Sequence, residues 1–210
     1  MLEIVSLDHN SPEWWEARRG IPTASAFSRI VTGTGKASDQ RSKYAAELAA
    51  NSYGALSEGF STQWTKRGTE LEPEAREYYS FTRGVELVEH QYATTDVWQG
   101  FGISLCGASP DAVIGDCGLL EVKCLSEAEH VMVLHYYAKN SRPKPQYIPQ
   151  TQGQLLVWDR RWVDLLYYHP DLPELCIRVD RDDEFCSKLV AGINAVTAMR
   201  DEYLATLEAA

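Results

Sequence analysis

Residues 109–124 of the chain read SPDAVIGDCGLLEVKC. Short apolar runs lie on either side of the glycine-containing stretch GDCG, and this pattern predicts a β-hairpin. Because side chains alternate along a strand, Glu121 and Lys123 point to one face while Leu120 and Val122 point to the other. Alternation produces such charged faces on many solvent-exposed strands, so the Glu-x-Lys pattern by itself indicates little.

Asp111 changes the interpretation of this hairpin. It lies directly opposite Glu121 if the pairing centres on residue 116, which requires an odd-numbered loop such as residues 114–118. Together with Lys123, the two carboxylates would then converge at one edge of the sheet. Two carboxylates suit Mg²⁺, which prefers oxygen ligands, and a lysine can orient or activate a metal-bound water. The hairpin is therefore either an ordinary charged surface element or a metal site.

The distribution of charge favours a bound cation. A formal net charge of −10 argues against nucleic-acid binding, because proteins that bind nucleic acid usually carry a basic surface. The acidic residues are concentrated, however: residues 68–125 contain ten Asp/Glu and three Lys/Arg, and residues 171–210 contain nine and four. The first block includes the hairpin, and a divalent cation would stabilise its clustered carboxylates. A solvent-exposed acidic face explains the second block equally well.

Length and composition indicate an ordinary globular protein. A chain of 210 residues is long enough for a full hydrophobic core, and no repeat or linker divides it, so we expect a single domain over residues 1–210. No apolar run approaches the length of a membrane span and the first residues do not resemble a signal peptide, which predicts a cytosolic protein without membrane contact. The five cysteines include no C-x-x-C pair, so we expect reduced thiols.

Capping residues and periodicity predict both helices and strands. Helices are expected at residues 11–19, 23–31, 38–56, 69–81, 126–139, 149–157 and 182–207. Strands are expected at residues 85–92, 101–106, 111–114, 119–124, 162–169 and 175–179. Helices around a block of strands, with one helical excursion before the last strands, predict an α/β fold with a mixed central sheet flanked by helices.

Four blocks of the sequence resemble the bacteriophage lambda exonuclease family, also called YqaJ-type viral recombinases. The blocks are WWEARRGIPTAS, RGTELEPEA, SPD…EVK and YIPQTQGQLLVW, and they follow the order of that family over residues 14–158. Within them, Pro110-Asp111 and Glu121-Val122-Lys123 match the PD-(D/E)xK nuclease pattern. The resemblance implies a single nuclease domain with a restriction-endonuclease-like core.

The resemblance also implies an activity. Such an enzyme is a Mg²⁺-dependent exonuclease with two metal ions per active site, and Mn²⁺ is able to substitute. It digests one strand of double-stranded DNA in the 5′-to-3′ direction from a 5′-phosphorylated end and leaves a 3′ overhang for recombination by strand annealing. The implied partners are duplex DNA with a free end, the other copies in a ring-shaped homotrimer and a single-strand annealing protein. The implied location is the cytoplasm of a bacterial host, with the gene carried by a phage or prophage.

The family pattern assigns roles to the hairpin residues. Asp111, Glu121 and the backbone carbonyl of Val122 would be metal ligands, and Lys123 would be the catalytic lysine. Glu72 would be a further carboxylate that reaches the metal directly or through water.

Several of the implied roles compete with structural ones. Glu72 lies three residues after Thr69, a spacing that equally fits a helix capping box. Gln152 would lie beside the metals, whereas a glutamine between two others on a helix is more often a surface residue.

The 5′-phosphate pocket would consist of Arg18, Ser25 and Ser109. Ser25 lies at the start of an expected helix, where free backbone N–H groups favour an anion. Family members can also insert an apolar residue into the duplex end just before the glycine equivalent to Gly68. The preceding residues here are mostly polar, so Trp64 is the remaining candidate for that wedge.

Three alternatives to the exonuclease remain open at this point. An endonuclease of the same superfamily, of the restriction or junction-resolving type, would cut circular DNA and ignore a 5′-phosphate. A non-catalytic DNA-binding module with a degenerate nuclease fold is disfavoured, because Asp111, Glu121 and Lys123 are all present. A metal-dependent hydrolase of small molecules would not need Arg18.

Overall fold

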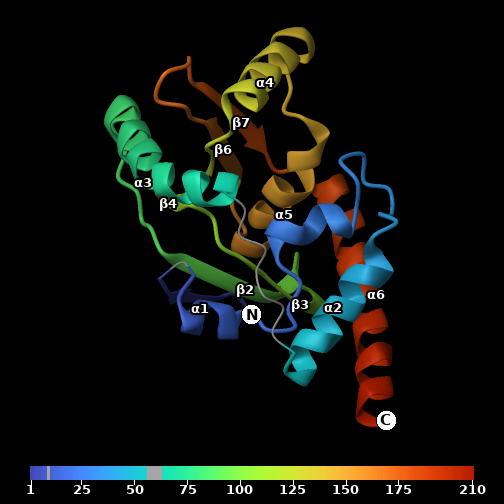
Figure 1. Ribbon diagram of the computed structural model, residues 1–210. Coiled ribbons are helices and arrows are strands. Elements are labelled where there is room, and N and C mark those ends of the chain that lie inside the picture. Colours follow the sequence, from blue (N-terminus) through green and yellow to red (C-terminus); the bar gives the residue numbers. More distant parts are fainter. Residues whose placement is uncertain (9, 56–62) are drawn as a thin grey trace.

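Two β-sheets form the framework of the computed structural model (Figure 1). The structure describes residues 1–8, 10–55 and 63–210, and within residues 63–69 it describes the backbone alone. In this part of the chain, one sheet has the strand order β1-β2-β3 and the other has the order β4-β5-β6-β7. The strands are β1 (Glu3–Ser6), β2 (Gln91–Trp98), β3 (Phe101–Ala108), β4 (Ala112–Ile114), β5 (Gly118–Lys123), β6 (Trp162–Tyr167) and β7 (Leu175–Asp180).

The four-stranded sheet is mixed. Strand β5 pairs with β6 in parallel, whereas β4 with β5 and β6 with β7 pair antiparallel. Two parallel neighbours require a long crossover connection, and helices α4 and α5 provide it here. The predicted mixed central sheet is confirmed. The strands expected near residues 85–92 and 101–106 do not join it, because β2 and β3 pair with each other and with β1 in a separate antiparallel sheet.

The β4–β5 hairpin has the predicted register. Ala112 pairs with Leu120 and Ile114 pairs with Gly118, so the pairing centres on residue 116. The loop contains the three residues 115–117 instead of the five in the expected example. Gly115 begins the loop with a φ of 51°, a left-handed conformation that glycine adopts without steric cost.

The helices begin largely where the capping residues predict. They are α1 (Pro12–Ala17), α2 (Arg41–Tyr53), α3 (Gln63–Arg83), α4 (Glu127–Asn140), α5 (Ile148–Trp158) and α6 (Asp183–Glu208), with short 3-10 helices η1 (Ala24–Arg29) and η2 (Pro145–Tyr147). The side chains of Ser11, Ser126 and Asp182 each accept a hydrogen bond from the backbone N–H three residues later. These bonds satisfy donors that a helix N-terminus leaves unpaired.

Helices cover both faces of the mixed sheet, with α3 on one side and α5 and α6 on the other (Figure 1). Alternate residues of β5 serve the two faces: Leu119 packs in the larger core with α5 and α6, while Leu120 and Val122 pack against α3. Because Glu121 shares the face of Leu119, its side chain points toward α5. The sheet thus places a carboxylate within one of its two apolar layers.

Two predicted starts were wrong by six residues, and α2 begins at Arg41 instead of residue 38. The strand expected at residues 85–92 runs instead over β2, and in the segment before it only Val88 forms an isolated bridge, with Val113. His90 has a φ of 56°, which interrupts the extended backbone between that bridge and β2. Helix α3 begins at Gln63, six residues before the expected start at Thr69.

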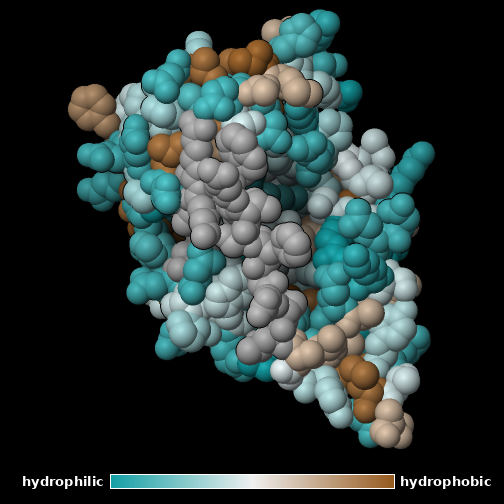
Figure 2. All heavy atoms as spheres, viewed as in Figure 1, coloured by the Kyte–Doolittle hydropathy of each residue, from teal (hydrophilic) through white to brown (hydrophobic). Residues whose placement is uncertain are grey.

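Apolar side chains also reach the surface. Figure 2 shows hydrophobic atoms at the end of the molecule where Figure 1 places α4, and there Val131 and Met132 are 52% and 60% exposed. In the described residues, no helix is both long and apolar enough to cross a membrane.

Candidate active site

The β4–β5 hairpin brings Asp111 and Lys123 next to Glu121, which is only 4% exposed. The Nζ of Lys123 donates a hydrogen bond to Oε1 of Glu121 over 2.6 Å. The Oδ2 of Asp111 accepts a hydrogen bond from the backbone N–H of Val122 over 2.5 Å. Since the N–H and C=O of one strand residue point toward the same neighbouring strand, the Val122 carbonyl also faces the Asp111 side. The hairpin therefore gathers two carboxylates, a carbonyl and an ammonium group.

Helix α5 holds the Glu121 carboxylate from the opposite side. Gln150 Nε2 donates to Oε1 of Glu121 and Gln154 Nε2 donates to Oε2, each over 2.5 Å. Lys123 also donates to Oε1 of Gln150 over 3.1 Å. Residues four apart lie on the same face of a helix, so one turn of α5 presents both amides to one carboxylate. The two glutamines fix the orientation of Glu121.

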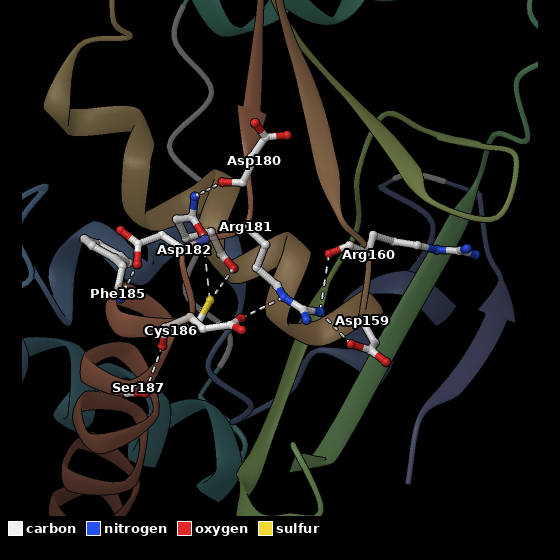
Figure 3. Close-up of polar contacts among 10 residues, drawn as sticks. Asp159, Arg160, Asp180, Arg181, Asp182, Phe185, Cys186 and Ser187 are labelled. Carbon is white, nitrogen blue, oxygen red and sulfur yellow. Dashed lines mark hydrogen bonds and ion pairs between the residues drawn. The ribbon is translucent and has the colours of Figure 1, made fainter.

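Gln152 does not lie in this cluster, and its expected position beside the carboxylates is corrected. Two residues along a helix is more than half a turn, so Gln152 faces away from its neighbours Gln150 and Gln154. Its Nε2 donates to the Asp180 carbonyl and its Oε1 accepts from the Asp182 N–H, both over 2.8 Å. Figure 3 shows this junction of β7 and α6, where Asp182 also caps the helix.

Glu72 reaches the same region from α3. Because α3 begins at Gln63, Thr69 lies within the helix, so the capping-box explanation for Glu72 does not hold. Burial raises the pKa of Glu72, and the nearby Glu121 raises it further, although Arg76 and Lys123 oppose the shift. Glu72 therefore lies close enough to the hairpin carboxylates to repel them.

The pKa shifts of the hairpin residues have the same origin. Burial holds the pKa of Asp111 well above its ordinary value, and the charges of Glu121 and Glu72 act in the same direction. Burial opposes the charge on Lys123, but attraction to Glu121 and Asp111 outweighs it and raises the pKa of the lysine. Three carboxylates thus lie around Lys123, with Arg76 acting on Glu72 as well, and further positive charge at this point would be favourable.

An open pocket lies beside these carboxylates. Its volume is about 160 Å³, and its lining includes Glu72, Asp111, Arg76 and Ser109. Arg76 pairs with Glu89 over 2.8 Å at this wall. The pocket connects the acidic cluster with Ser109, one of the residues expected to bind a 5′-phosphate.

The donor set fits a hard divalent cation. In the described part of the chain, no group of three or more His, Cys, Asp and Glu side chains is already arranged around a metal position. The available ligands are nevertheless all oxygens, which Mg²⁺ and Mn²⁺ prefer. Oε1 of Gln154 is buried with no hydrogen-bond partner among the described residues, although its amide nitrogen is bound to Glu121. A buried acceptor of this kind suits water molecules carried by a hydrated cation.

The three residues expected to bind a phosphate lie together. Arg18 Nη2 donates to Oγ of Ser25 over 3.2 Å and to Oγ1 of Thr23 over 3.0 Å. The Arg18 guanidinium lies 3.9 Å from the centre of the Trp14 ring, and Trp14 Nε1 donates to Oγ of Ser109 over 3.4 Å. Burial lowers the pKa of Arg18, but a guanidinium stays charged at any physiological pH.

Sequence reasoning missed three residues of these clusters. The signal for Gln150 and Gln154 was their spacing of four on an expected helix, which outweighs the resemblance that pointed to Gln152. Thr23 begins the helix expected at residues 23–31, but its side chain makes no capping hydrogen bond and contacts Arg18 instead. The side chain of Trp64, the candidate wedge, lies outside the described residues.

The chain is similar to a known protein family and to several solved structures. A family model described as the YqaJ-like viral recombinase domain matches residues 13–161. No curated protein matches the chain. An alkaline exonuclease, LHK-Exo from Laribacter hongkongensis, is 32% identical with a TM-score of 0.79, and 94% of this chain and 96% of that chain are covered.

Two further solved structures are similar. LHK-Exo in complex with dAMP is 33% identical with a TM-score of 0.77 over the same shares of the two chains. A phage-related exonuclease from Haemophilus somnus 129PT is 17% identical with a TM-score of 0.67, covering 92% of this chain and 99% of that one. At such low identity, the last similarity shows the fold alone.

Proposed function

Because the chain belongs to the YqaJ-like viral recombinase family and has the mixed α/β fold of the PD-(D/E)xK type, we propose that it is a DNA exonuclease. The observation that carries this proposal is the cluster of Asp111, Glu121 and Lys123 on the β4–β5 hairpin. The similarity to LHK-Exo, which is described as an alkaline exonuclease, supports the choice of an exonuclease over the other open alternatives. In this proposal residues 1–210 act as one nuclease domain in the cytoplasm of a bacterial host.

Asp111, Glu121 and the Val122 carbonyl would hold the cations, two Mg²⁺ ions or Mn²⁺ in their place. When bound, the cations supply a nucleophilic water and neutralise charge on the phosphate that is cleaved. Gln150 and Gln154 keep the Glu121 carboxylate in one orientation, which limits the cost of assembling the site.

In this mechanism Lys123 stabilises negative charge on the phosphate, and Glu72 accepts a proton. The Nζ of Lys123, which donates to Glu121 here, can instead donate to an oxygen of the attacked phosphate. The raised pKa of Glu72 suits a carboxylate that accepts a proton from the attacking water, since a base is most effective when its pKa approaches the working pH. Neither role requires Gln152, whose contacts lie at the β7–α6 junction.

The direction of digestion follows from the second cluster. Arg18 and the hydroxyls of Ser25 and Ser109 would bind the 5′-phosphate, so digestion would proceed from 5′ to 3′. The product would be a duplex with a 3′ single-stranded overhang, ready for a single-strand annealing protein. Thr23 adds a third hydroxyl to this pocket.

Assembly into a ring-shaped homotrimer completes the proposal. The exposed apolar side chains of Val131 and Met132 on α4 are the kind of surface that an oligomer or a protein partner covers. A ring would also retain DNA topologically, which suits a protein with a net charge of −10. The same surface also suits the annealing protein, and formation of the trimer does not exclude binding of that partner.

Digestion of linear and circular DNA tests the proposed activity. The protein would be given a linear duplex labelled at one end of each strand and a covalently closed circle of the same sequence, with Mg²⁺ or with EDTA. We expect Mg²⁺-dependent shortening of the linear duplex from its 5′ ends and an intact circle. Cleavage of the circle would indicate an endonuclease, and no hydrolysis of either DNA in Mg²⁺ would indicate a non-catalytic DNA-binding module.

A further inference from the structure

Trp14 connects the two halves of the proposed phosphate pocket, which come from distant parts of the chain. Its ring lies under the Arg18 guanidinium at 3.9 Å, and its Nε1 donates to Oγ of Ser109 over 3.4 Å. Arg18 follows α1, whereas Ser109 lies between β3 and β4. The indole itself is only 5% exposed. One side chain therefore contacts a residue on each side of the pocket.

The Arg18 guanidinium is held without being neutralised. No carboxylate among the described residues forms an ion pair with it, and its hydrogen bonds go to the hydroxyls of Thr23 and Ser25. An aromatic face attracts a cation through its quadrupole and leaves the net charge in place. The ring of Tyr92, at 5.7 Å, adds a second aromatic surface. Stacking on Trp14 thus removes much of the rotational freedom of Arg18 before any anion arrives.

The contact with Ser109 has a different effect. The Ser109 hydroxyl donates to the Gln91 carbonyl over 3.1 Å and accepts from Trp14. A phosphate monoester is mainly an acceptor, so Ser109 must turn its proton away from Gln91 in order to bind one. The Trp14 N–H occupies a lone pair of the same oxygen throughout, which leaves the hydroxyl proton as the group that can turn toward the anion.

We propose that Trp14 is a positioning residue that sets the preference for a 5′-phosphorylated end by fixing Arg18 and Ser109 relative to each other. This inference rests on the proposed 5′-phosphate pocket. It gives Trp14 a role in specificity, whereas a buried tryptophan on a short amphipathic helix is ordinarily explained by packing alone.

Three variants separate the contributions of the indole. Trp14→Leu removes both the stacking face and the N–H donor, and Trp14→Phe keeps a ring for Arg18 but removes the donor to Ser109. Trp15→Leu is the matched control, because Trp15 lies next to Trp14 in α1, packs edge-to-face on its ring at 4.7 Å and is 52% exposed. In the described residues, the Trp15 side chain makes no hydrogen bond or cation–π contact with Arg18 or Ser109. Its backbone carbonyl accepts from the Arg18 N–H over 3.3 Å, a contact that Trp15→Leu leaves in place.

The measurement is the ratio of digestion rates for linear duplexes that carry a 5′-phosphate or a 5′-hydroxyl, with Mg²⁺. We expect Trp14→Leu to lower this ratio by about 3- to 30-fold, the range that loss of a partly buried cation–π contact produces. The loss should appear as a higher KM for the phosphorylated end, with the slow digestion of hydroxyl ends unchanged. Trp14→Phe should give a smaller decrease, and Trp15→Leu should match the native ratio.

The outcomes distinguish this inference from the function on which it rests. A native protein with no preference for 5′-phosphate would overturn the pocket and the role of Trp14 together. A native preference that survives unchanged in Trp14→Leu, or equal slowing on both ends, would overturn the role of Trp14 alone. If Trp14→Leu does not fold, Trp14→Phe decides, because an unchanged ratio in that variant contradicts the proposed contact with Ser109.

Discussion

Glu121 receives hydrogen bonds from Lys123, Gln150 and Gln154 while it lies almost fully buried. A buried carboxylate is tolerated only with such partners, because an unpaired charge in an apolar layer is costly. The same three contacts give the carboxylate one orientation, which a metal ligand needs. Stability and function therefore depend on the same hydrogen bonds at this residue.

Variants of the α5 glutamines test which glutamine supports activity and which supports stability alone. Gln150→Ala should lower the digestion rate by about 10- to 100-fold, because the Glu121 carboxylate loses one of the groups that orient it. Gln152→Ala should instead lower the free energy of unfolding by about 1–3 kcal/mol, because it leaves the Asp180 carbonyl and the Asp182 N–H without a partner. Rates and denaturant unfolding of both variants would be compared, and the reverse pattern would place the functional glutamine at position 152.

Asp111 gives a prediction about pH. Its pKa is held well above the ordinary value of 3.8 by burial, Glu121 and Glu72. The unfolded chain therefore releases this proton at a lower pH than the folded protein, so the contribution of Asp111 to the stability of the metal-free protein falls as pH rises from about 4. We expect Asp111→Asn to remove part of this fall and to raise Tm at about pH 8 in EDTA. A gain of about 1 kcal/mol in the free energy of unfolding corresponds to an increase in Tm of about 2–4 °C.

Thermal unfolding across this pH range, in EDTA and in Mg²⁺, checks the expectation. Mg²⁺ should raise the Tm of the native protein more than that of Asp111→Asn, since the variant lacks a ligand charge. Asp116→Asn is the control, because Asp116 lies exposed in the loop of the same hairpin. An Asp111→Asn variant that is less stable than the native protein in EDTA at high pH would contradict this account.

Much of the acidic cluster could be predicted from the sequence, because strand geometry is local. Strand alternation and an odd loop fix the positions of Asp111, Glu121 and Lys123 relative to one another without any tertiary information. The roles of Gln150 and Gln154 could not be predicted in the same way, because the face of α5 that meets β5 depends on how the helix packs. The alternative for Glu72 could be resolved only once the start of α3 was known.

At the level of the elements, the β4–β5 hairpin is held in register by its contact with β6. Gly118 begins β5, and a Cβ at this position would meet the ring of Trp162 on β6. Glycine is therefore required by close approach and not by backbone conformation. Asp111 and Lys123 both lie at the end of the hairpin opposite its loop, so a displacement of β5 would reach the proposed active site.

Gly118→Ala should lower the free energy of unfolding by about 1–3 kcal/mol, because the added methyl group has no space beside Trp162. Gly102→Ala is the matched control, since Gly102 lies in β3 with no atom within 4 Å of an added Cβ. Denaturant unfolding of both variants measures the difference. Equal stabilities would show that β5 is not packed against Trp162 as described.

The prediction of elements succeeded where local chemistry decides the outcome. Capping side chains at Ser11, Ser126 and Asp182 fix helix starts from residues a few positions apart. It failed for β1, whose four residues are all exposed, because a short edge strand has no apolar face to reveal it. The 3-10 form of η1 was also missed, since its backbone is set by packing of Phe27 in the core.

At the scale of the whole molecule, the net charge of −10 is consistent with DNA binding only if contact is local. Arg18 provides such a local contact, and the acidic hairpin would reverse its charge on binding cations. A ring would hold the duplex without a broadly basic surface. The oligomeric state is therefore as informative about function as the active site.

The proposed ring predicts the mass in solution. Light scattering or sedimentation should give three times the 23.6 kDa of the single chain. A mass of one chain at the concentrations used for digestion would contradict the ring and would require another explanation for DNA retention. Salt dependence of the mass would show how much of the interface is electrostatic.

If the hairpin cluster cleaves DNA from the 5′ end, loss of the Lys123 ammonium group must slow digestion. A linear duplex with 5′-phosphates and a label on each strand would be digested in Mg²⁺ by the native protein, by Lys123→Ala and by Lys139→Ala, which alters an exposed lysine at the end of α4. We expect the native protein and Lys139→Ala to shorten each strand from its 5′ end, and Lys123→Ala to be slower by about 100-fold or more. Digestion by Lys123→Ala at the native rate would contradict the account.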